Sequence, residues 1–319
     1  MPTLTSNSSE LTWRPARVGL SFRFGLFALW TSRLDALLPC EHFTEWPDDP
    51  SLTNFPYIEL ENGIDAIVMR SHPVSRPLPA FSLKGDAFWY STKSYCHYWT
   101  DLRGSFDGYL AHFSSKSRTT LRRKVRRLFA QWPNQVHFQT YRTPEEMGAF
   151  LKLARQVSRQ TYQERLLNAG IPETPEFLNK LQKLAGSDSV RGFILSVGAE
   201  PIAYLCTPAR NGVLNYDYLG YAPEYANWSV GTVLQYLAFE SLFAEWRFTC
   251  FDFTEGDAPQ KQLFSTHSKT CSDLYVFPCR PSMFLLAFAH YALGRVVAGC
   301  LRLAGFLKLR EGIRKWLHR

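Results

Sequence analysis

A cluster of polar side chains follows an aromatic stretch near residue 250. Phe251-Asp252-Phe253 leads into Glu255, Gly256 and Asp257, and Lys261 comes four positions later. A carboxylate can accept a proton during catalysis, and an ammonium group can hold an anionic substrate as a point charge. An ordinary core strand that runs into a solvated turn would also contain Gly-Asp and an exposed lysine. The pattern therefore predicts either a strand-end site or a plain turn.

An earlier aromatic run, Val213 to Tyr221, contains the alternating triplet Tyr216-Asp217-Tyr218. Asp217, like Glu255, is a candidate general base, and Tyr218 is a candidate proton donor or acceptor-positioning group. Tyr216 is a candidate substrate contact. The alternative is structural, because alternation on a strand can place two rings on one face and a solvated carboxylate on the other.

Small and β-branched residues at Ser229-Val230-Gly231-Thr232 predict the start of a helix. The unpaired backbone N–H groups of a first helical turn, with the positive end of the helix dipole, can bind a diphosphate. Gly231 would let such a group approach closely. The alternative is an ordinary helix capped by Ser229.

The net charge of +8 is concentrated in two segments. Lys116 to Arg127 contains seven basic residues and no acidic one, and a second basic set runs from Arg295 to the end. Arg118 and Arg122 are candidate substrate contacts in the first segment. A solvated helix face, an anionic glycan, a lipid-linked saccharide diphosphate, RNA and a membrane headgroup are all compatible with it.

The bulk composition predicts a globular, cytoplasmic protein. The 319 residues are 45% hydrophobic, which suffices for one large domain or two smaller ones. The seven cysteines are scattered and the eight histidines show no paired spacing, so we expect a reduced compartment, no metal and no histidine-based triad. The polar segment from Met1 to Glu10 lacks the order of a secretory signal.

Hydrophobic periodicity and cap residues give the order of elements. We expect strands at 57–60, 64–70 and 87–91, a connection at 99–113, and a basic helix after Ser114 and Ser115 with an apolar stripe of Leu121, Val125, Leu128 and Phe129. Thr143-Pro144-Glu145-Glu146 and Thr174-Pro175-Glu176 predict two helix starts, the second helix ending near Gly186. An antiparallel meander over 190–197, 202–208 and 213–221, a helix from 229 and a strand at 248–253 follow.

The C-terminal segment Met283 to Leu309 is strongly apolar but contains His290, Arg295 and Arg302. Two arginines seven residues apart lie on one helical face, which disfavours a transmembrane span. A packed or self-associating helix, a helix in a membrane interface, and a span remain three open readings.

The residues and their order resemble the GNAT superfamily of acyltransferases, in particular its CelD/BcsL branch, and are similar also to the Fem-type peptidoglycan aminoacyltransferases. The resemblance covers about residues 109–264. It rests on Tyr109-Leu110, Ser117 to Arg123, Glu200 to Ala203, Tyr221 with Ser229-Val230-Gly231, and Asp252 to Asp257 with Lys261. Two positions depart from the family pattern: Ala226 stands where Arg or Gln is usual, and Gln260 stands where an aromatic is frequent.

The resemblance implies an α/β (α+β) fold, a mixed and largely antiparallel sheet flanked by helices. It also implies three regions: 1–108, a degenerate GNAT-like half; 109–280, the acyltransferase domain; and 281–319, a basic amphipathic helical segment. The donor would be acetyl-CoA or another acyl-CoA, bound by Ser229, Val230, Gly231 and Thr232, with backbone N–H groups of 216–219 polarising its carbonyl. Asp257 and Lys261 match the strand-end carboxylate and lysine of the family, whose lysine meets the acceptor's phosphate side in Fem-type relatives.

Three functions follow as hypotheses. The first is acyl transfer from acyl-CoA to an amine or hydroxyl of a saccharide, amino-sugar or lipid-linked glycan acceptor, in polysaccharide biosynthesis. The second is a Fem-like transferase that uses aminoacyl-tRNA, with the basic helix as the RNA contact. The third is a non-enzymatic, membrane-associated protein on a GNAT scaffold. In all three, residues 281–319 could attach the protein to the inner face of the plasma membrane.

Overall fold

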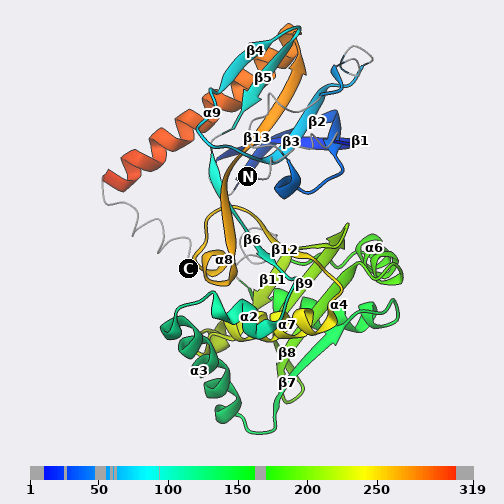
Figure 1. The fold of residues 1–319 in the computed structure, drawn as a ribbon, viewed down its shortest axis with the longest axis vertical. Coiled ribbons are helices and arrows are strands. Elements are labelled where there is room, and N and C mark those ends of the chain that lie inside the picture. Colours follow the sequence, from blue (N-terminus) through cyan, green and yellow to red (C-terminus); the bar gives the residue numbers. More distant parts are fainter. Residues whose placement is uncertain are drawn as a thin grey trace, which may run out of the picture. The chain divides into compact units, whose positions relative to one another are not determined.

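A computed structural model describes residues 11–24, 27–46, 55–57, 60, 63–92, 94–161 and 170–306, with side chains to residue 300 (Figure 1). The chain forms two compact units, one of residues 98–268 and the other of residues 1–97 with 269–319. The strands form a mixed sheet in which most pairs are antiparallel, as the sequence predicts, while β2–β3 and β10–β12 are parallel. Helices flank the strands, so the predicted fold class is confirmed.

The unit of residues 98–268 contains a sheet in the order β12-β10-β9-β8-β7, with β11 paired to β9. The chain enters this unit through β6 (Tyr95–Asp101) and leaves it through β13 (His267–Pro278). Its strands are β7 (Val136–Tyr141), β8 (Val190–Val197), β9 (Glu200–Arg210), β10 (Val213–Asn215), β11 (Tyr218–Tyr221) and β12 (Cys250–Glu255). Its helices are α2 (Phe106–Ala111), α3 (Ser115–Gln131), α4 (Glu146–Ser158), α6 (Pro175–Gly186), η3 (Pro223–Trp228), α7 (Val230–Glu245) and α8 (Pro259–Phe264).

Both faces of this sheet are covered. The first six residues of β8 are all buried, although successive side chains on a strand point to opposite faces. Ile194 belongs to a core cluster with residues of α4 and α6, including Phe150 and Leu181. The other helix that contacts β8 and β9 is α7. Ten residues of α7 are buried, so it forms a second core layer on the sheet.

The predicted third strand of the meander is divided into two. Asn211 and Gly212 form the expected turn, both with positive φ, and β10 then pairs in parallel with β12 as far as Asn215 opposite Asp252. The next strand, β11, pairs with β9. Within the described residues no pairing joins β11 to β12, so the two strands separate at Tyr216. The sequence did not indicate this break, because its aromatic alternation continues through it.

The cap residues predict two of three helix starts correctly. The Ser114 side chain accepts the Ser117 N–H at the start of α3, and the Thr174 side chain accepts the Phe177 N–H at the start of α6. The third helix, α4, begins at Glu146, two residues later than predicted. The predicted reciprocal glutamate is nevertheless formed, because Glu146 Oε2 accepts the Thr143 N–H, as well as the Arg142 N–H. In α3 the predicted apolar stripe is buried at Leu121 and Leu128, whereas Phe129 is exposed.

The unit of residues 1–97 and 269–319 is built on a long hairpin, β1 (Trp13–Phe24) with β2 (Phe27–Pro39). The sheet continues through β3 (Ala66–Pro73) and β13, and β4 (Phe81–Lys84) and β5 (Ala87–Ser91) extend it from β13. The short helix η1 (Phe43–Glu45) follows β2. The long helix α9 (Pro281–Phe306) packs on β1.

Two expectations for the first 113 residues are wrong. The predicted strand at 57–60 is not formed: residues 57 and 60 have helical conformation, and 58–59 lie outside the described residues. The predicted connection at 99–113 contains the end of β6 and all of α2, which Ser105 caps by accepting the Gly108 N–H. Residues 1–10, on which the absence of a signal was argued, also lie outside the described residues. The predicted division at 1–108, 109–280 and 281–319 stays a prediction.

Candidate functional site

A cavity of ≈ 610 Å³ opens where β11 leaves β12, entirely within the unit of residues 98–268. Parallel pairing between β10 and β12 ends at Asn215, and the Tyr216 N–H makes one further hydrogen bond to the Asp252 carbonyl before the chain turns to pair β11 with β9. The lining residues come from β11 and the link before it, from η3, and from the end of β12 with α8. They are Thr161, Tyr204, Tyr216, Asp217, Tyr218, Leu219, Gly220, Tyr221, Pro223, Ala226, Thr254, Gln260 and Lys261.

The predicted triplet Tyr216-Asp217-Tyr218 lies at this opening. The Tyr216 N–H donates to the Asp252 carbonyl at 2.9 Å and the Asp217 N–H to the Asn215 carbonyl at 3.0 Å, so neither group is available to polarise a substrate carbonyl in this arrangement. Successive N–H groups on a strand point to opposite edges, and the Ala222 N–H donates to the Ile202 carbonyl of β9, so the Tyr218 N–H also points towards β9. Of the predicted backbone donors at 216–219, the Leu219 N–H therefore remains as a candidate. The open edge of β11 is the only part of the predicted donor set that can take this role.

The carboxylate of Asp217 is the strongest candidate base. The residue is exposed to the cavity, yet the protein around it raises the pKa of its carboxyl by desolvation, and Lys180 opposes this rise. In the part of the chain that the structure describes, no hydrogen bond or ion pair engages this carboxylate. A carboxylate with a raised pKa and no fixed partner is suited to accept a proton from a substrate.

The hydroxyl of Tyr218 lies on the first residue of β11, with its ring edge-on to Phe177 at 5.6 Å. Desolvation and the nearby Asp217 raise the pKa of Tyr218 above its ordinary value. Desolvation also raises the pKa of Tyr216, whose ring packs near Phe253 at 5.7 Å. Both phenols therefore remain protonated at neutral pH and can donate to a developing negative charge.

Lys261 contributes a positive charge at the far wall of the cavity. Its Nζ donates to the Glu255 carbonyl at 2.6 Å and lies 3.4 Å from the Thr254 carbonyl. Burial lowers the pKa of Lys261, while the nearby carboxylates of Glu255 and Asp252 oppose this effect. The lysine thus holds the turn after β12, where Thr254 has φ 59°, and also faces the cavity.

Gln260 is a cavity residue that the sequence marked only as a departure from the family pattern. Its Nε2 donates to Oε1 of Gln235 at 2.7 Å, and Gln235 is fully buried in α7. The Gln235 Nε2 has no hydrogen-bond partner among the described residues. The hydrogen bond to the buried Gln235 therefore fixes the position of the Gln260 amide at the cavity wall.

The predicted helix start adjoins the cavity. Helix α7 begins at Val230, and Ser229 precedes it in the left-handed conformation without a side-chain cap hydrogen bond. Val230 and Gly231 are buried, and the N–H groups of a first helical turn have no partner within the helix. A Cβ on Gly231 would lie 3.3 Å from the ring of Tyr221, which lines the cavity. The N–H groups of Val230, Gly231 and Thr232 thus end close to the cavity wall.

Two of the predicted catalytic residues, Glu255 and Asp257, are not among the residues that line the cavity, and neither are Ser229, Val230, Gly231 and Thr232. Glu255 is exposed in the turn after β12, and only its carbonyl meets Lys261. Asp257 accepts hydrogen bonds from Tyr98 Oη at 2.9 Å and from Gln262 Nε2 at 2.6 Å, and these bonds lower the pKa of its carboxyl. The hydrogen bonds of Asp257 therefore stabilise the turn that leads to Lys261.

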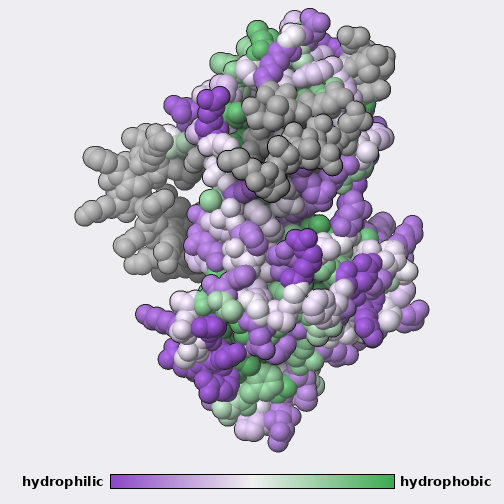
Figure 2. Space-filling view, viewed as in Figure 1, coloured by the Kyte–Doolittle hydropathy of each residue, from purple (hydrophilic) through white to green (hydrophobic). Residues whose placement is uncertain are grey.

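The predicted contacts Arg118 and Arg122 lie on α3, outside the cavity lining. Arg118 donates to Ser115 Oγ at 3.2 Å, and Arg122 lies 4.0 Å from Asp107. Figure 2 shows hydrophilic side chains gathered over α3. Helix α3 contacts η3 and α7, and the Arg127 guanidinium stacks over the Trp228 ring at 4.5 Å. The basic helix therefore lies beside the segment that leads into the α7 start.

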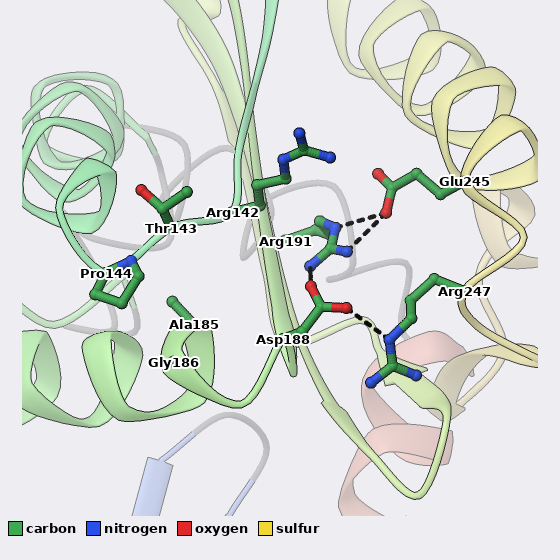
Figure 3. Close-up of a pocket in the computed structure, with 9 residues that line it drawn as sticks. All are labelled: Arg142, Thr143, Pro144, Ala185, Gly186, Asp188, Arg191, Glu245 and Arg247. Carbon is green, nitrogen blue, oxygen red and sulfur yellow. Dashed lines mark hydrogen bonds and ion pairs between the residues drawn. The ribbon is translucent and has the colours of Figure 1, made fainter.

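A second cavity in the same unit, ≈ 600 Å³, contains a network of paired charges (Figure 3). The Arg191 guanidinium is 3% exposed and lies 2.8 Å from both Glu245 and Asp188. Arg247 in turn lies 2.6 Å from Asp188. Because Arg191 also donates to the Val190 carbonyl, each of its nitrogen atoms has an acceptor, which indicates a structural role. No local sequence pattern indicates this network.

Metal ligands were not expected. Among the described residues, no group of three or more His, Cys, Asp or Glu side chains has an arrangement that could hold a metal ion. The expectation that the protein needs no metal stays a prediction.

The sequence of residues 115–262 matches the family model described as the acetyltransferase (GNAT) domain. Residues 115–262, which are less than half of the chain, are therefore similar to GNAT acetyltransferase domains. This segment includes every residue of the α7 start and every residue of the cavity lining. Comparison with curated protein sequences finds no significant match.

Comparison with solved structures finds similar chains at low sequence identity. The structure of FemX superposes with a TM-score of 0.51 and 10% identity, over 86% of this chain and 90% of FemX. A conserved protein of unknown function from Bacteroides thetaiotaomicron gives a TM-score of 0.47 at 11% identity, over 77% and 79% of the two chains. L-PGS from Bacillus licheniformis gives 0.46 at 14% identity, over 82% and 86%. The GNAT-like fold is thus common to this chain and FemX.

Proposed function

We propose that this protein transfers an acyl group, acetyl in the first instance, from acyl-CoA to an amine or hydroxyl of a saccharide or amino-sugar acceptor. The observation that carries the proposal is the cavity between β11 and β12, which brings Asp217, Tyr218 and Lys261 together. The uncapped start of α7 does not line this cavity, but Gly231 lies against Tyr221, which does. The GNAT match over residues 115–262 supports acyl transfer as the reaction class.

The start of α7 would hold the donor. Acyl-CoA carries a diphosphate, and the N–H groups of Val230, Gly231 and Thr232 in the first turn of α7 would offer it hydrogen bonds and a favourable dipole. Ala226, in place of a longer side chain, leaves room at the cavity rim, where it is exposed. The acyl arm would then run along the open edge of β11 and place its thioester carbonyl near Tyr218.

The cavity residues would divide the proton transfers. Asp217 would accept the proton of the acceptor amine or hydroxyl as its nitrogen or oxygen attacks the thioester carbonyl. Backbone N–H groups on the open edge of β11 would stabilise the oxyanion. As the carbon–sulfur bond breaks, Tyr218 would protonate the departing thiolate. Glu255 is the alternative base, and its exposed position after β12 makes it the weaker candidate.

The lining favours a polyhydroxylated acceptor. Tyr204, Tyr216, Tyr218 and Tyr221 provide ring faces against which the apolar side of a sugar can pack, while Thr254 and Gln260 provide hydrogen-bonding groups. Lys261 would neutralise a phosphate on a lipid-linked glycan or nucleotide sugar. A role in polysaccharide biosynthesis, as in the CelD/BcsL branch, is the setting that this acceptor suggests. Asp257 would act through Lys261 as a positioning residue.

A second candidate is an aminoacyl-tRNA-dependent transferase. The fold shared with FemX over 86% of the chain favours it, together with the position of α3 beside η3 and α7. Arg118, Arg122 and their basic neighbours would contact the RNA backbone, and binding would weaken steeply with salt. A non-enzymatic protein on this scaffold is a third candidate, to be recognised by the absence of turnover with any donor.

A donor screen separates these candidates. The full-length protein is incubated with acetyl-CoA, longer acyl-CoAs and aminoacyl-tRNA in the presence of amino sugars, and product masses and free CoA thiol are measured. We expect acetylated amino sugar and one free thiol per transfer. Binding of tRNA that is lost in Arg122→Glu/Arg126→Glu, without acyl-CoA turnover, would replace the first candidate by the second.

We further propose a cytoplasmic location for this activity, and a degenerate GNAT-like half within residues 1–108. The donor supports the location, because acyl-CoA is a cytoplasmic metabolite. Fractionation of cells that produce the full-length protein tests the location directly.

A further inference from the structure

The outer face of α9 is apolar and uncovered. The stretch Pro281–Cys300 has a mean hydropathy of 1.5, and only 6% of its residues are buried. No other described helix is long and apolar enough to cross a membrane. Leu285 is 68% exposed, Phe288 49% and Val296 58%. These residues recur at spacings of three and eight, so they lie on one helical stripe together with Ala292. A soluble helix would normally present polar side chains on this stripe.

The opposite face of α9 is bound to its own unit. Ala287 is fully buried in a core cluster with residues of β1, β2, β3 and β5, and Met283 packs against the same cluster. Tyr90 Oη and His290 Nδ1 share a hydrogen bond of 2.6 Å, and Phe22 meets the His290 ring edge-on at 5.2 Å. In Figure 1, α9 lies beside the sheet and its second half extends beyond the strands.

Exposed apolar groups on neighbouring elements enlarge this face. Trp30 on β2 is 56% exposed and packs on Phe22, which also contacts α9, and Leu29 beside it is 62% exposed. At the start of α9, a groove of ≈ 560 Å³ is lined mainly by apolar side chains, including Leu83, which is 75% exposed, and Phe284. Exposed aromatic and aliphatic groups collected around one helix indicate an interaction surface.

The charges around the stripe identify the partner as anionic. Arg295 is exposed at the border of the stripe, and Arg302 follows seven residues later in the sequence. Residues 302–319 contain six Lys or Arg residues and a single acidic residue, Glu311. Arginine at the border of an apolar stripe can extend its guanidinium to lipid phosphates while its stem stays on apolar surface.

We propose that the outer stripe of α9, with Trp30 and the groove at its start, is a membrane-docking surface that lies in the interface of a bilayer rich in anionic lipid. The basic residues of 302–319 would add attraction of about 1 kcal/mol each near such a surface. A transmembrane orientation would expose the whole circumference of α9 to lipid and would break its buried contacts at Ala287 and His290, so the helix lies along the surface.

The test uses vesicle co-sedimentation of the full-length protein. Vesicles of phosphatidylcholine alone are compared with vesicles that also contain phosphatidylglycerol, at low and high salt. The variant Leu285→Glu/Phe288→Glu adds two charges to the stripe, and Ala130→Glu/Asn179→Glu adds the same charge at exposed positions of α3 and α6. We expect the wild-type protein and the control to bind vesicles with phosphatidylglycerol, with less binding at high salt, and the stripe variant to bind at least about tenfold more weakly.

Three outcomes would overturn the proposal. One is equal binding by the stripe variant and the wild-type protein. Another is a wild-type protein that resists alkaline extraction from membranes, which would indicate a span. The third is a wild-type dimer, detected by light scattering, that the stripe variant loses while neither protein binds vesicles. Circular dichroism of the stripe variant checks that it is folded, so loss of binding is not confused with unfolding.

Discussion

Two cavities of similar volume in the same unit differ in whether their charged side chains are paired. The buried guanidinium of Arg191 pairs at 2.8 Å with Glu245 and with the half-exposed Asp188, and every guanidinium nitrogen has an acceptor. At Asp217, a carboxylate with a raised pKa opens into the cavity, and no ion pair is found for it among the described residues. Paired charges of the first kind stabilise the fold. Charges of the second kind cost stability and are available to a substrate.

The largest expected effect is on folding, at the paired network. Arg191→Met leaves Glu245, which is 16% exposed, and part of Asp188 without their partner. Removing one member of a buried ion pair destabilises by about 3 to 5 kcal/mol. Urea unfolding should show this loss, with a folded fraction that retains the wild-type kcat/KM. A variant with wild-type stability would show that the network does not stabilise the fold.

The next effect is on activity, at the unpaired carboxylate. Asp217→Asn removes the proposed base and should lower kcat by about a hundredfold or more. Its thermal midpoint should stay equal or rise, because the amide carries no charge to desolvate. Parallel rate and melting measurements check both. Full activity of Asp217→Asn would show that Glu255 or the acceptor itself is the base. Glu255→Gln is the matched comparison.

The pH dependence provides a smaller and more specific signal. Because desolvation raises the pKa of Asp217 in the folded protein, its neutral form is favoured there. Activity needs the ionised form, so kcat/KM should fall as pH drops through this raised pKa, above the ordinary value of about 3.9. The contribution of Asp217 to folding stability depends on pH in the opposite direction to its contribution to activity: it is lost as pH rises through the same pKa. The acid limb should disappear in the residual activity of Asp217→Asn.

The smallest effect is on acceptor affinity. Lys261→Met removes the charge at the cavity wall and should raise the KM for a phosphorylated acceptor about tenfold, with less change for a neutral amino sugar. Lys261→Arg keeps the charge and should retain most of the affinity. Equal KM increases for both acceptors would indicate that Lys261 only holds the turn at Thr254 and Glu255.

The sequence predicts much of the fold because local chemistry decides it. Ser114 and Thr174 cap helices as their side chains require, and Asn211-Gly212 turns the meander because both residues accept positive φ. The break at Tyr216 was not predictable, since aromatic alternation continues through it while strand pairing, a tertiary property, ends. The predicted aromatic residues and Asp217 therefore lie at the site, but the strand separation that forms the cavity was not predicted.

The site was only partly predictable for the same reason. Lys261 lines the cavity as the resemblance suggested, whereas Asp257 turns to Tyr98, a partner 159 residues away in sequence. Gln260 and its buried support Gln235 give no local signal, because both read as ordinary polar helix residues. Arg191 lies in an apolar strand and pairs with Glu245 across 54 residues. Long-range partners decide which charges are paired and which are free.

Calorimetric titration of the full-length protein with acetyl-CoA tests whether the start of α7 binds the acyl-CoA donor. The variant Gly231→Glu places a carboxylate at the buried α7 start, where the diphosphate would lie, and Ala130→Glu is its charge-matched control on α3. We predict saturable binding with one donor per chain, retained in the control and lost in Gly231→Glu. Absence of binding for every acyl-CoA, or unchanged binding by a folded Gly231→Glu protein, would contradict the account.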